Sequence, residues 1–245
     1  MSTQVKSGAD FSRLAGIGGV LYLCIIASGL FAELYVRSGL VVADDMQATV
    51  SNLMANEFLF RLGFVSDLFM LLCDLALALV LYQLLKPVSR TLALAAVCTR
   101  LAMDCILALN LLNHFLALLL INDSVVTTVF NTAQIQGLLG LVLQAHSVGY
   151  SIGLVFFAVH CLVLGYLLFH SRLFPKTLAM LMSFAALSYL VDSFAKFLVA
   201  GYATSDYPII MLPALIAEVS FCLWLLFKGV YVPTHASINR LRTAG

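Results

Sequence analysis

Six separate runs of mostly apolar residues divide the chain, and each run is long enough to cross a lipid bilayer as an α-helix. A spanning helix needs about 20 such residues, because the hydrocarbon core of a bilayer is about 30 Å thick. The six runs are Leu14–Tyr35, Leu59–Leu85, Leu92–Ile121, Leu141–Phe169, Leu178–Ala200 and Ile209–Phe227. Only 10% of the 245 residues are charged, which is too few to cover the surface of a soluble domain of this length. The sequence therefore predicts an all-α, polytopic membrane bundle of six transmembrane helices, formed as a single domain over residues 1–245.

The overall charge and the cysteines exclude several kinds of partner. Thirteen Lys and Arg residues against twelve Asp and Glu residues give a net charge of +1, so no basic surface for nucleic acid is expected. The six cysteines all fall inside apolar runs and form no C-x-x-C pair, which is typical of packing residues rather than of a disulfide or zinc framework. The expected partners are the lipid bilayer and a small-molecule or lipid ligand.

The lysines and arginines gather on alternate connections between the runs. Nine fall on the side that holds the N-terminus, one falls on the opposite side, and three fall inside the runs. Cytoplasmic loops carry the excess of Lys and Arg in membrane proteins, so this alternation predicts that both termini lie in the cytoplasm. The nine are Lys6, Arg13, Lys86, Arg90, Arg172, Lys176, Lys228, Arg240 and Arg242; the single one is Arg37; the three are Arg61, Arg100 and Lys196.

The connection between the first and second runs contains a helical pattern of its own. Met46, Val50, Leu53 and Met54 recur at the spacing of one helical face. We therefore expect a short helix that lies on the outer surface of the bundle.

Ionisable residues within the runs need partners, because a charge near the bilayer centre costs about 2.5–3.5 kcal/mol on insertion scales. Counting 1.5 Å per residue from the Lys86–Arg90 turn brings Asp74 of the second run and Arg100 of the third to a similar depth. Asp104 lies one turn beyond Arg100 on the same helix. These three residues are predicted to form a structural ion-pair network that joins the helices.

The outer half of the runs holds a larger set of polar residues. Arg61 is placed to bridge Glu33 or Asp67, and Asp192 with Lys196 forms a second pair at i,i+4. This is more polar chemistry than a few ion pairs require, so we infer a polar cavity that opens toward the outer face and binds a ligand. A pure packing role for the same residues stays open. The predicted ligand-binding residues are Arg61, Asp67, His114, His146, Tyr150, Asp192 and Lys196.

The fourth run carries the most specific pattern. His146, Gly149, Gly153, Phe157 and His160 share one helical face, and Gly149-x-x-x-Gly153 would let another backbone approach closely.

His114 of the third run lies at the depth of His146, which raises two alternatives to a binding or transport protein. One is a zinc-dependent intramembrane hydrolase with both histidines as metal ligands, and the other is a single haem bound by the same pair. A scaffold without a ligand is a further alternative. The sequence does not decide whether the protein is an enzyme.

Four segments of the chain together resemble a known family. They are Phe31–Ser38, Asn56–Phe64, Leu81–Val88 and His146–Phe157, within a resemblance that runs from about Phe11 to Tyr231. The chain is similar here to the bacterial multi-pass membrane proteins grouped as domain of unknown function 4386. The resemblance implies a location in the cell inner (cytoplasmic) membrane, and it brings no established activity.

Overall fold

The structure is a computed structural model, and it describes residues 8–43, 45–204 and 207–229. Six of its helices are long and apolar enough to cross a membrane, which confirms the predicted all-α bundle of six spans. These candidate spans are Asp10–Leu40, Glu57–Leu85, Arg90–Asn122, Thr132–His170, Lys176–Leu198 and Pro208–Lys228. No strand occurs in the described part of the chain. Three cations of the charge count, Lys6, Arg240 and Arg242, lie outside the described residues.

Two of the spans contain more than one kind of helix. The first span starts as α1 (Gly8–Leu30), widens into the π-helix η1 (Phe31–Arg37) and ends as α2 (Ser38–Leu40). The last span runs through η3 (Pro208–Met211), α9 (Leu212–Leu223) and the π-helix η4 (Trp224–Lys228). The remaining helices are α3 (Met46–Ala55), α4 (Glu57–Leu85), α5 (Arg90–Asn122), α6 (Ser124–Val129), α7 (Thr132–His170) and α8 (Lys176–Leu198).

Polar caps decide where several helices begin. The Ser89 hydroxyl accepts a hydrogen bond of 3.3 Å from the Leu92 amide, so α5 starts directly after the Pro87 turn. At the start of α7, Asn131 and Gln134 exchange two hydrogen bonds of 3.0 Å in a capping box. Because this cap lies ahead of the apolar run, α7 begins at Thr132 rather than at the predicted Leu141.

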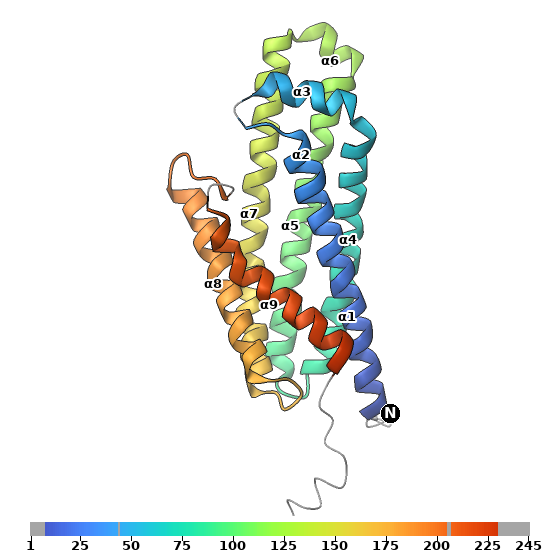
Figure 1. The fold of residues 1–245 in the computed structure, drawn as a ribbon, viewed down its shortest axis with the longest axis vertical. Coiled ribbons are helices and arrows are strands. Elements are labelled where there is room, and N and C mark those ends of the chain that lie inside the picture. The colour runs from blue at the N-terminus through green and yellow to red at the C-terminus, as the bar shows by residue number, and fades with distance from the viewer. Residues whose placement is uncertain (1–7, 44, 205–206, 230–245) are drawn as a thin grey trace, which may run out of the picture.

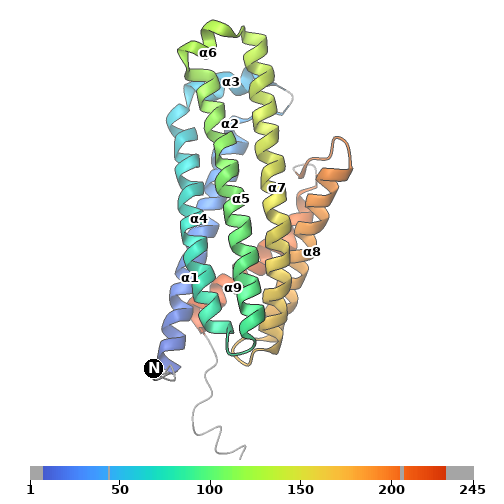
Figure 2. The same cartoon turned by 180° about the vertical axis from the view of Figure 1, so that it is seen from behind.

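The six spans follow one another around the bundle in chain order. α4 packs against α1 and α5, α7 packs against α5 and α8, and α9 packs against α8. α9 then crosses obliquely from the far end of α8 to the base of α1 and closes the ring (Figure 1), while the view from behind shows α4, α5 and α7 side by side (Figure 2). Gly19 permits this closure, because a Cβ atom there would lie 2.7 Å from the backbone nitrogen of Leu226.

The spans differ strongly in length. At 1.5 Å per residue, the 23 residues of α8 measure about 34 Å and the 39 residues of α7 measure about 58 Å. The far ends of α5 and α7 therefore extend past α8, and α3 and α6 cover them (Figure 1). The predicted short helix between the first two spans is thus present as α3, capped by the Asp45 carboxylate, which accepts a 2.8 Å hydrogen bond from the Ala48 amide.

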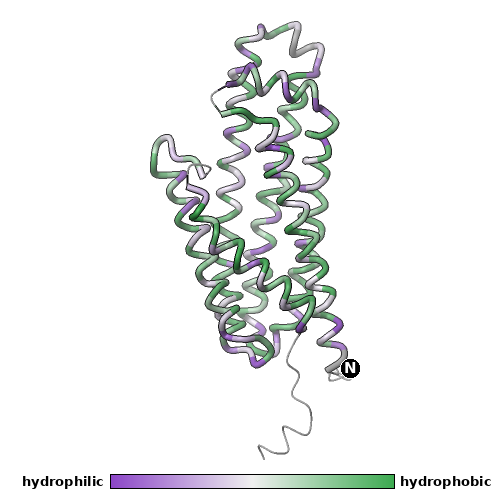
Figure 3. Tube along the Cα trace, in the orientation of Figure 1, coloured by the Kyte–Doolittle hydropathy of each residue, from purple (hydrophilic) through white to green (hydrophobic). Residues whose placement is uncertain are grey.

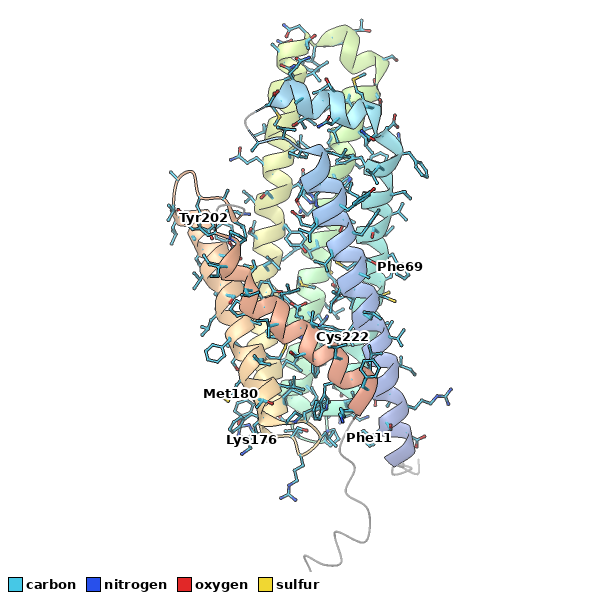
Figure 4. All side chains as sticks on the ribbon, viewed as in Figure 1. Phe11, Phe69, Lys176, Met180, Tyr202 and Cys222 are labelled. Atoms are coloured by element: carbon cyan, nitrogen blue, oxygen red, sulfur yellow. The ribbon has the colours of Figure 1, made fainter. Side chains whose placement is uncertain are left out.

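The outside of the bundle is apolar over most of its length. Figure 3 shows hydrophobic residues along the long helices, with hydrophilic residues gathered mainly toward the two ends. Phe69 and Met180 are exposed and project from opposite sides of the bundle (Figure 4), where lipid would cover them. Lys176 and Phe11 lie at the same end, opposite α3 and α6 (Figure 4). The positive-inside rule assigns this end to the cytoplasm, and that orientation remains a prediction.

Candidate functional site

Seven polar side chains come together between η1, α4, α5 and α7, in the half of the bundle nearer to α3 and α6. We call them the outer cluster. Its members are Glu33, Arg37, Asp67, Asn110, His114, His146 and Tyr150.

Arg37 is the charged centre of the outer cluster. Its Nε donates a 2.7 Å hydrogen bond to Glu33, and its two terminal nitrogens donate to the buried carboxylate of Asp67. Glu33 and Arg37 lie on the π-helix η1, whose wider turn is a feature often found at functional sites. The ion pair therefore joins the first and second spans at the irregular part of the first.

The two histidines of the outer cluster lie edge to face, with ring centroids 5.9 Å apart. Nε2 of His114 donates to the Phe60 carbonyl at 3.0 Å, and Nδ1 of His146 lies 3.3 Å from the Asn110 carbonyl. The Asn110 amide donates in turn to the His146 carbonyl at 2.8 Å. A ring nitrogen that donates to a carbonyl leaves the other nitrogen of a neutral imidazole as an acceptor. Nδ1 of His114 is therefore an acceptor without a hydrogen bond in the described part of the chain. Nδ1 of His146 also lies 3.4 Å from Nδ2 of Asn110, and its Nε2 has no hydrogen bond there.

The glycines of α7 make this arrangement possible. A Cβ atom at Gly149 would lie 2.2 Å from Oδ1 of Asn110, and one at Gly153 would lie 2.7 Å from Cδ2 of Leu107. The spacing of these glycines predicted close approach of another helix. α5 is the helix that packs there, and its side chains fill the space that a Cβ atom would need.

The predicted position of Arg61 in a ligand cavity is wrong. Arg61 pairs with Glu57 on its own helix at 2.6 Å, and the two side chains are 46% and 36% exposed. Arg37 takes the contacts with Glu33 and Asp67 that were expected for Arg61. The reason is that the first helix continues to Leu40, so Arg37 belongs to a span rather than to a loop. The one feature of the sequence that indicated a partner for Arg37 was Glu33, which lies four residues before it.

Asp192 and Lys196 do not form the predicted pair. The Asp192 carboxylate accepts hydrogen bonds from Tyr202 at 2.8 Å and from Thr204 at 3.0 Å, both in the loop after α8. Lys196 donates to Ser147 of α7 at 3.1 Å. Within the described residues, no hydrogen bond or ion pair links either side chain to the outer cluster. Asp192 therefore anchors the loop after α8 by hydrogen bonds, and Lys196 links the end of α8 to α7.

A second group, the inner cluster, lies deeper in the bundle and receives at least one side chain from every span. Arg100 donates to both carboxylate oxygens of Asp74, with Nε 2.6 Å from Oδ2. The depth count had placed these two residues together. Asp104 differs from the prediction, because neither of its oxygens has a hydrogen-bond partner among the described residues. The members are Tyr22, Asp74, Arg100, Asp104, His160, Tyr189 and Glu218.

Two grooves of the structure lie away from both clusters. One of about 520 Å³ runs between α8 and the η3–α9 segment, and one of about 310 Å³ runs between α7 and α8. Their walls are mostly apolar, and neither is lined by a member of either cluster.

The geometry gives little support to the metal and haem alternatives. Over residues 8–43, 45–204 and 207–229, no group of three or more His, Cys, Asp or Glu side chains could hold a metal ion. Asp67, which could have completed a site with His114 and His146, is bound to Arg37. For a haem, the two rings would have to separate around the porphyrin, and Phe60 already stacks on His114 with centroids 4.0 Å apart.

Fold and clusters together define a class: a polytopic helical membrane protein with two clusters of polar and charged side chains inside the bundle. The chain belongs to the family described as "Domain of unknown function (DUF4386)", whose sequence model matches residues 17–229. This range contains every member of both clusters. The chain is also similar to an uncharacterized protein of the archaeon Archaeoglobus fulgidus, with 27% identity over 162 residues that cover 65% of this chain and 78% of that protein. No solved structure matches the chain.

Proposed function

We propose that this protein binds a small or lipid-like molecule at the outer cluster and works as a binding or transport protein of the cell inner membrane. The observation that carries the proposal is a set of polar groups beyond those that hold the helices together.

The ion pair at Arg37 is complete without the rest of the outer cluster. Arg37 is paired with Glu33 and Asp67, and two histidines and a tyrosine lie in the same cluster. The second ring nitrogen of each histidine and the Tyr150 hydroxyl make no hydrogen bond in the described part of the chain. These three atoms are free to contact a ligand.

The unused atoms indicate the chemistry of that ligand. Neutral imidazole nitrogens accept hydrogen bonds, and a tyrosine hydroxyl accepts or donates one. Asp67 and Glu33 carry two negative charges against the one positive charge of Arg37. The cluster thus favours a molecule with amine or hydroxyl groups, either free in solution or as the headgroup of a lipid.

The position of the outer cluster along the bundle axis supports access of a ligand from the outer side of the membrane. Lys196, two residues before the end of α8, contacts Ser147, which adjoins His146. A span of 23 residues is only about long enough to cross the bilayer, so the end of α8 lies near the membrane surface and His146 is at the boundary between bilayer and water. A headgroup in the outer leaflet and a solute from outside both reach this level.

Thermal unfolding in lipid nanodiscs with amine and polyol probes tests the proposal. The probes are ethanolamine, spermidine, glycerol and vesicles of phosphatidylethanolamine. We expect at least one of them to raise the unfolding temperature of the wild type but not of Tyr150→Phe, which loses only a hydroxyl group. Tyr166→Phe is the matched control, because Tyr166 is an exposed tyrosine of the same helix, and it should respond like the wild type. The proposal fails if no probe stabilises the wild type or if Tyr150→Phe responds equally.

A further inference from the structure

The inner cluster contains more acids than bases. Asp74, Asp104 and Glu218 contribute three carboxyl groups, and Arg100 contributes the single guanidinium that interacts with all three. Glu218 is the central residue of the Pro208–Lys228 span, so this imbalance lies deep in the bundle.

Three of the five N–H donors of Arg100 are used by partners other than Asp104. It holds Asp74 with two hydrogen bonds, and its Nη1 donates to Nε2 of His160 at 3.0 Å. The rings of Tyr22 and Phe157 lie 5.8 Å and 5.3 Å from its guanidinium carbon. No donor of Arg100 is directed at Asp104, since Asp104 has no hydrogen-bond partner in the described part of the chain.

His160 does not supply the missing positive charge. Its Nδ1 donates to the Ala96 carbonyl at 2.8 Å, and its Nε2 accepts from Arg100. An imidazole with one donating and one accepting nitrogen is neutral, and a second proton would break the bond to Arg100. His160 is therefore a fixed, uncharged acceptor.

Asp104 is left as a buried acid without a partner. Its relative exposure is 8%, and both of its oxygens are buried without a donor among the described residues. Asp104 interacts electrostatically with the carboxyl group of Asp74. Two carboxylates only accept, so a hydrogen bond between them requires a proton on one of the acids.

We propose that Asp104 binds an exchangeable proton, which it shares with Asp74, and that the inner cluster is a proton-binding site within the membrane. The carboxylate of Asp104 takes a proton from a hydronium ion, an O–H bond forms, and water is released. The protonated acid donates to Asp74, which keeps its ion pair with Arg100. Acids that exchange protons inside transmembrane helices are typical of proton-coupled membrane proteins.

The ionisable groups of the inner cluster come from all six spans. Glu218, which accepts a hydrogen bond from Tyr189, interacts electrostatically with Arg100 and also with Tyr150 of the outer cluster. It is the other acid that could hold the proton, so the experiment has to separate the two. The ionisable neighbours to be considered are Tyr22, Asp74, Arg100, His160, Cys161, Tyr189 and Glu218.

Infrared spectroscopy of the protein in lipid at neutral pH tests the proposal. A protonated carboxylic acid has a C=O stretching band that is separate from the amide bands and shifts in D₂O. We expect this band in the wild type, its loss in Asp104→Asn, and its retention in Glu218→Gln and in the surface control Glu57→Gln. Asparagine has the shape of the protonated acid and donates to Asp74 in the same way, so Asp104→Asn should fold.

Three outcomes overturn the proposal. The first is the absence of the band in the wild type, which needs no variant. The second is a band that survives in Asp104→Asn, and the third is a band that disappears only in Glu218→Gln. A pH series adds a readout that packing alone would not give, because the band should decline as the pH rises in the wild type and stay absent in Asp104→Asn. The probe series at the outer cluster is independent of these results.

Discussion

Replacing Arg100 by glutamine removes the only cation of the inner cluster. In the wild type, Arg100 and Asp74 are 1% and 3% exposed and share two hydrogen bonds, and His160 receives a third. Arg100→Gln leaves the Asp74 carboxylate without a counter-charge and His160 Nε2 without its donor. Removing one member of a buried ion pair costs about 3–5 kcal/mol, and we expect a loss of this size.

The matched control is Arg61→Gln. Arg61 and Glu57 also form an ion pair, but their side chains are 46% and 36% exposed, and such a pair contributes only about 0–1 kcal/mol. The same chemical change should therefore be several times more damaging at Arg100 than at Arg61. The double variant Asp74→Asn/Arg100→Gln should recover part of the loss, because no buried charge of this pair is then left alone.

The assay is unfolding of the reconstituted protein, followed by the emission of Trp224, the single tryptophan of the chain. Neutral hydrogen bonds between membrane helices average about 0.6 kcal/mol in double-mutant cycles, so a coupling energy well above this value identifies the ion pair. The reasoning is refuted if Arg100→Gln and Arg61→Gln differ by less than about 1 kcal/mol, the upper value for an exposed pair.

Three further experiments probe other parts of the account. Gly149→Ala should destabilise the protein by about 1–3 kcal/mol, as overpacking does, because the new methyl group meets Asn110. The control is Gly137→Ala on the same helix, where an added Cβ would have no atom within 4 Å and should not destabilise the protein. Equal unfolding curves for the two variants would contradict this. Arg37→Gln should cost about 1–3 kcal/mol by leaving the buried Asp67 unpaired, and unfolding unchanged from the wild type would count against the outer ion pair. In a cysteine-free background, an impermeant maleimide should label Gln134→Cys on intact cells and Arg172→Cys only after lysis; the reverse pattern would invert the topology.

The spans and the Asp74–Arg100 pair could be predicted from the sequence for a physical reason. The Lys86–Arg90 turn joins two straight antiparallel helices, so counting residues from it gives equal depths to residues that face each other. The same count could not decide that Asp104 would lack a donor. That outcome depends on the side-chain direction of Arg100, whose hydrogen bonds go to Asp74 and to His160 of α7.

The outer site was harder to predict because it depends on side-chain directions and on one irregular helix. No pattern in the sequence indicated the π-helix Phe31–Arg37, which turns Arg37 toward Asp67. The partners of Asp192 come from the loop after α8, and sequence spacing along a helix contains no information on such a contact. The depth of His114 and His146 was predicted well, whereas their hydrogen bonds to backbone carbonyls followed only from packing.

The central claim is that charged side chains of a lipid-embedded six-span bundle meet inside it in two separate clusters. A cryo-electron microscopy map of the protein in lipid nanodiscs, bound to an antibody fragment, tests it most directly. The account predicts side-chain density for Arg100 between Asp74 and His160, density for Arg37 beside Asp67, and lipid density against the outer faces of α4 and α5. Density that places Arg100 or Arg37 toward lipid, away from these partners, would contradict it.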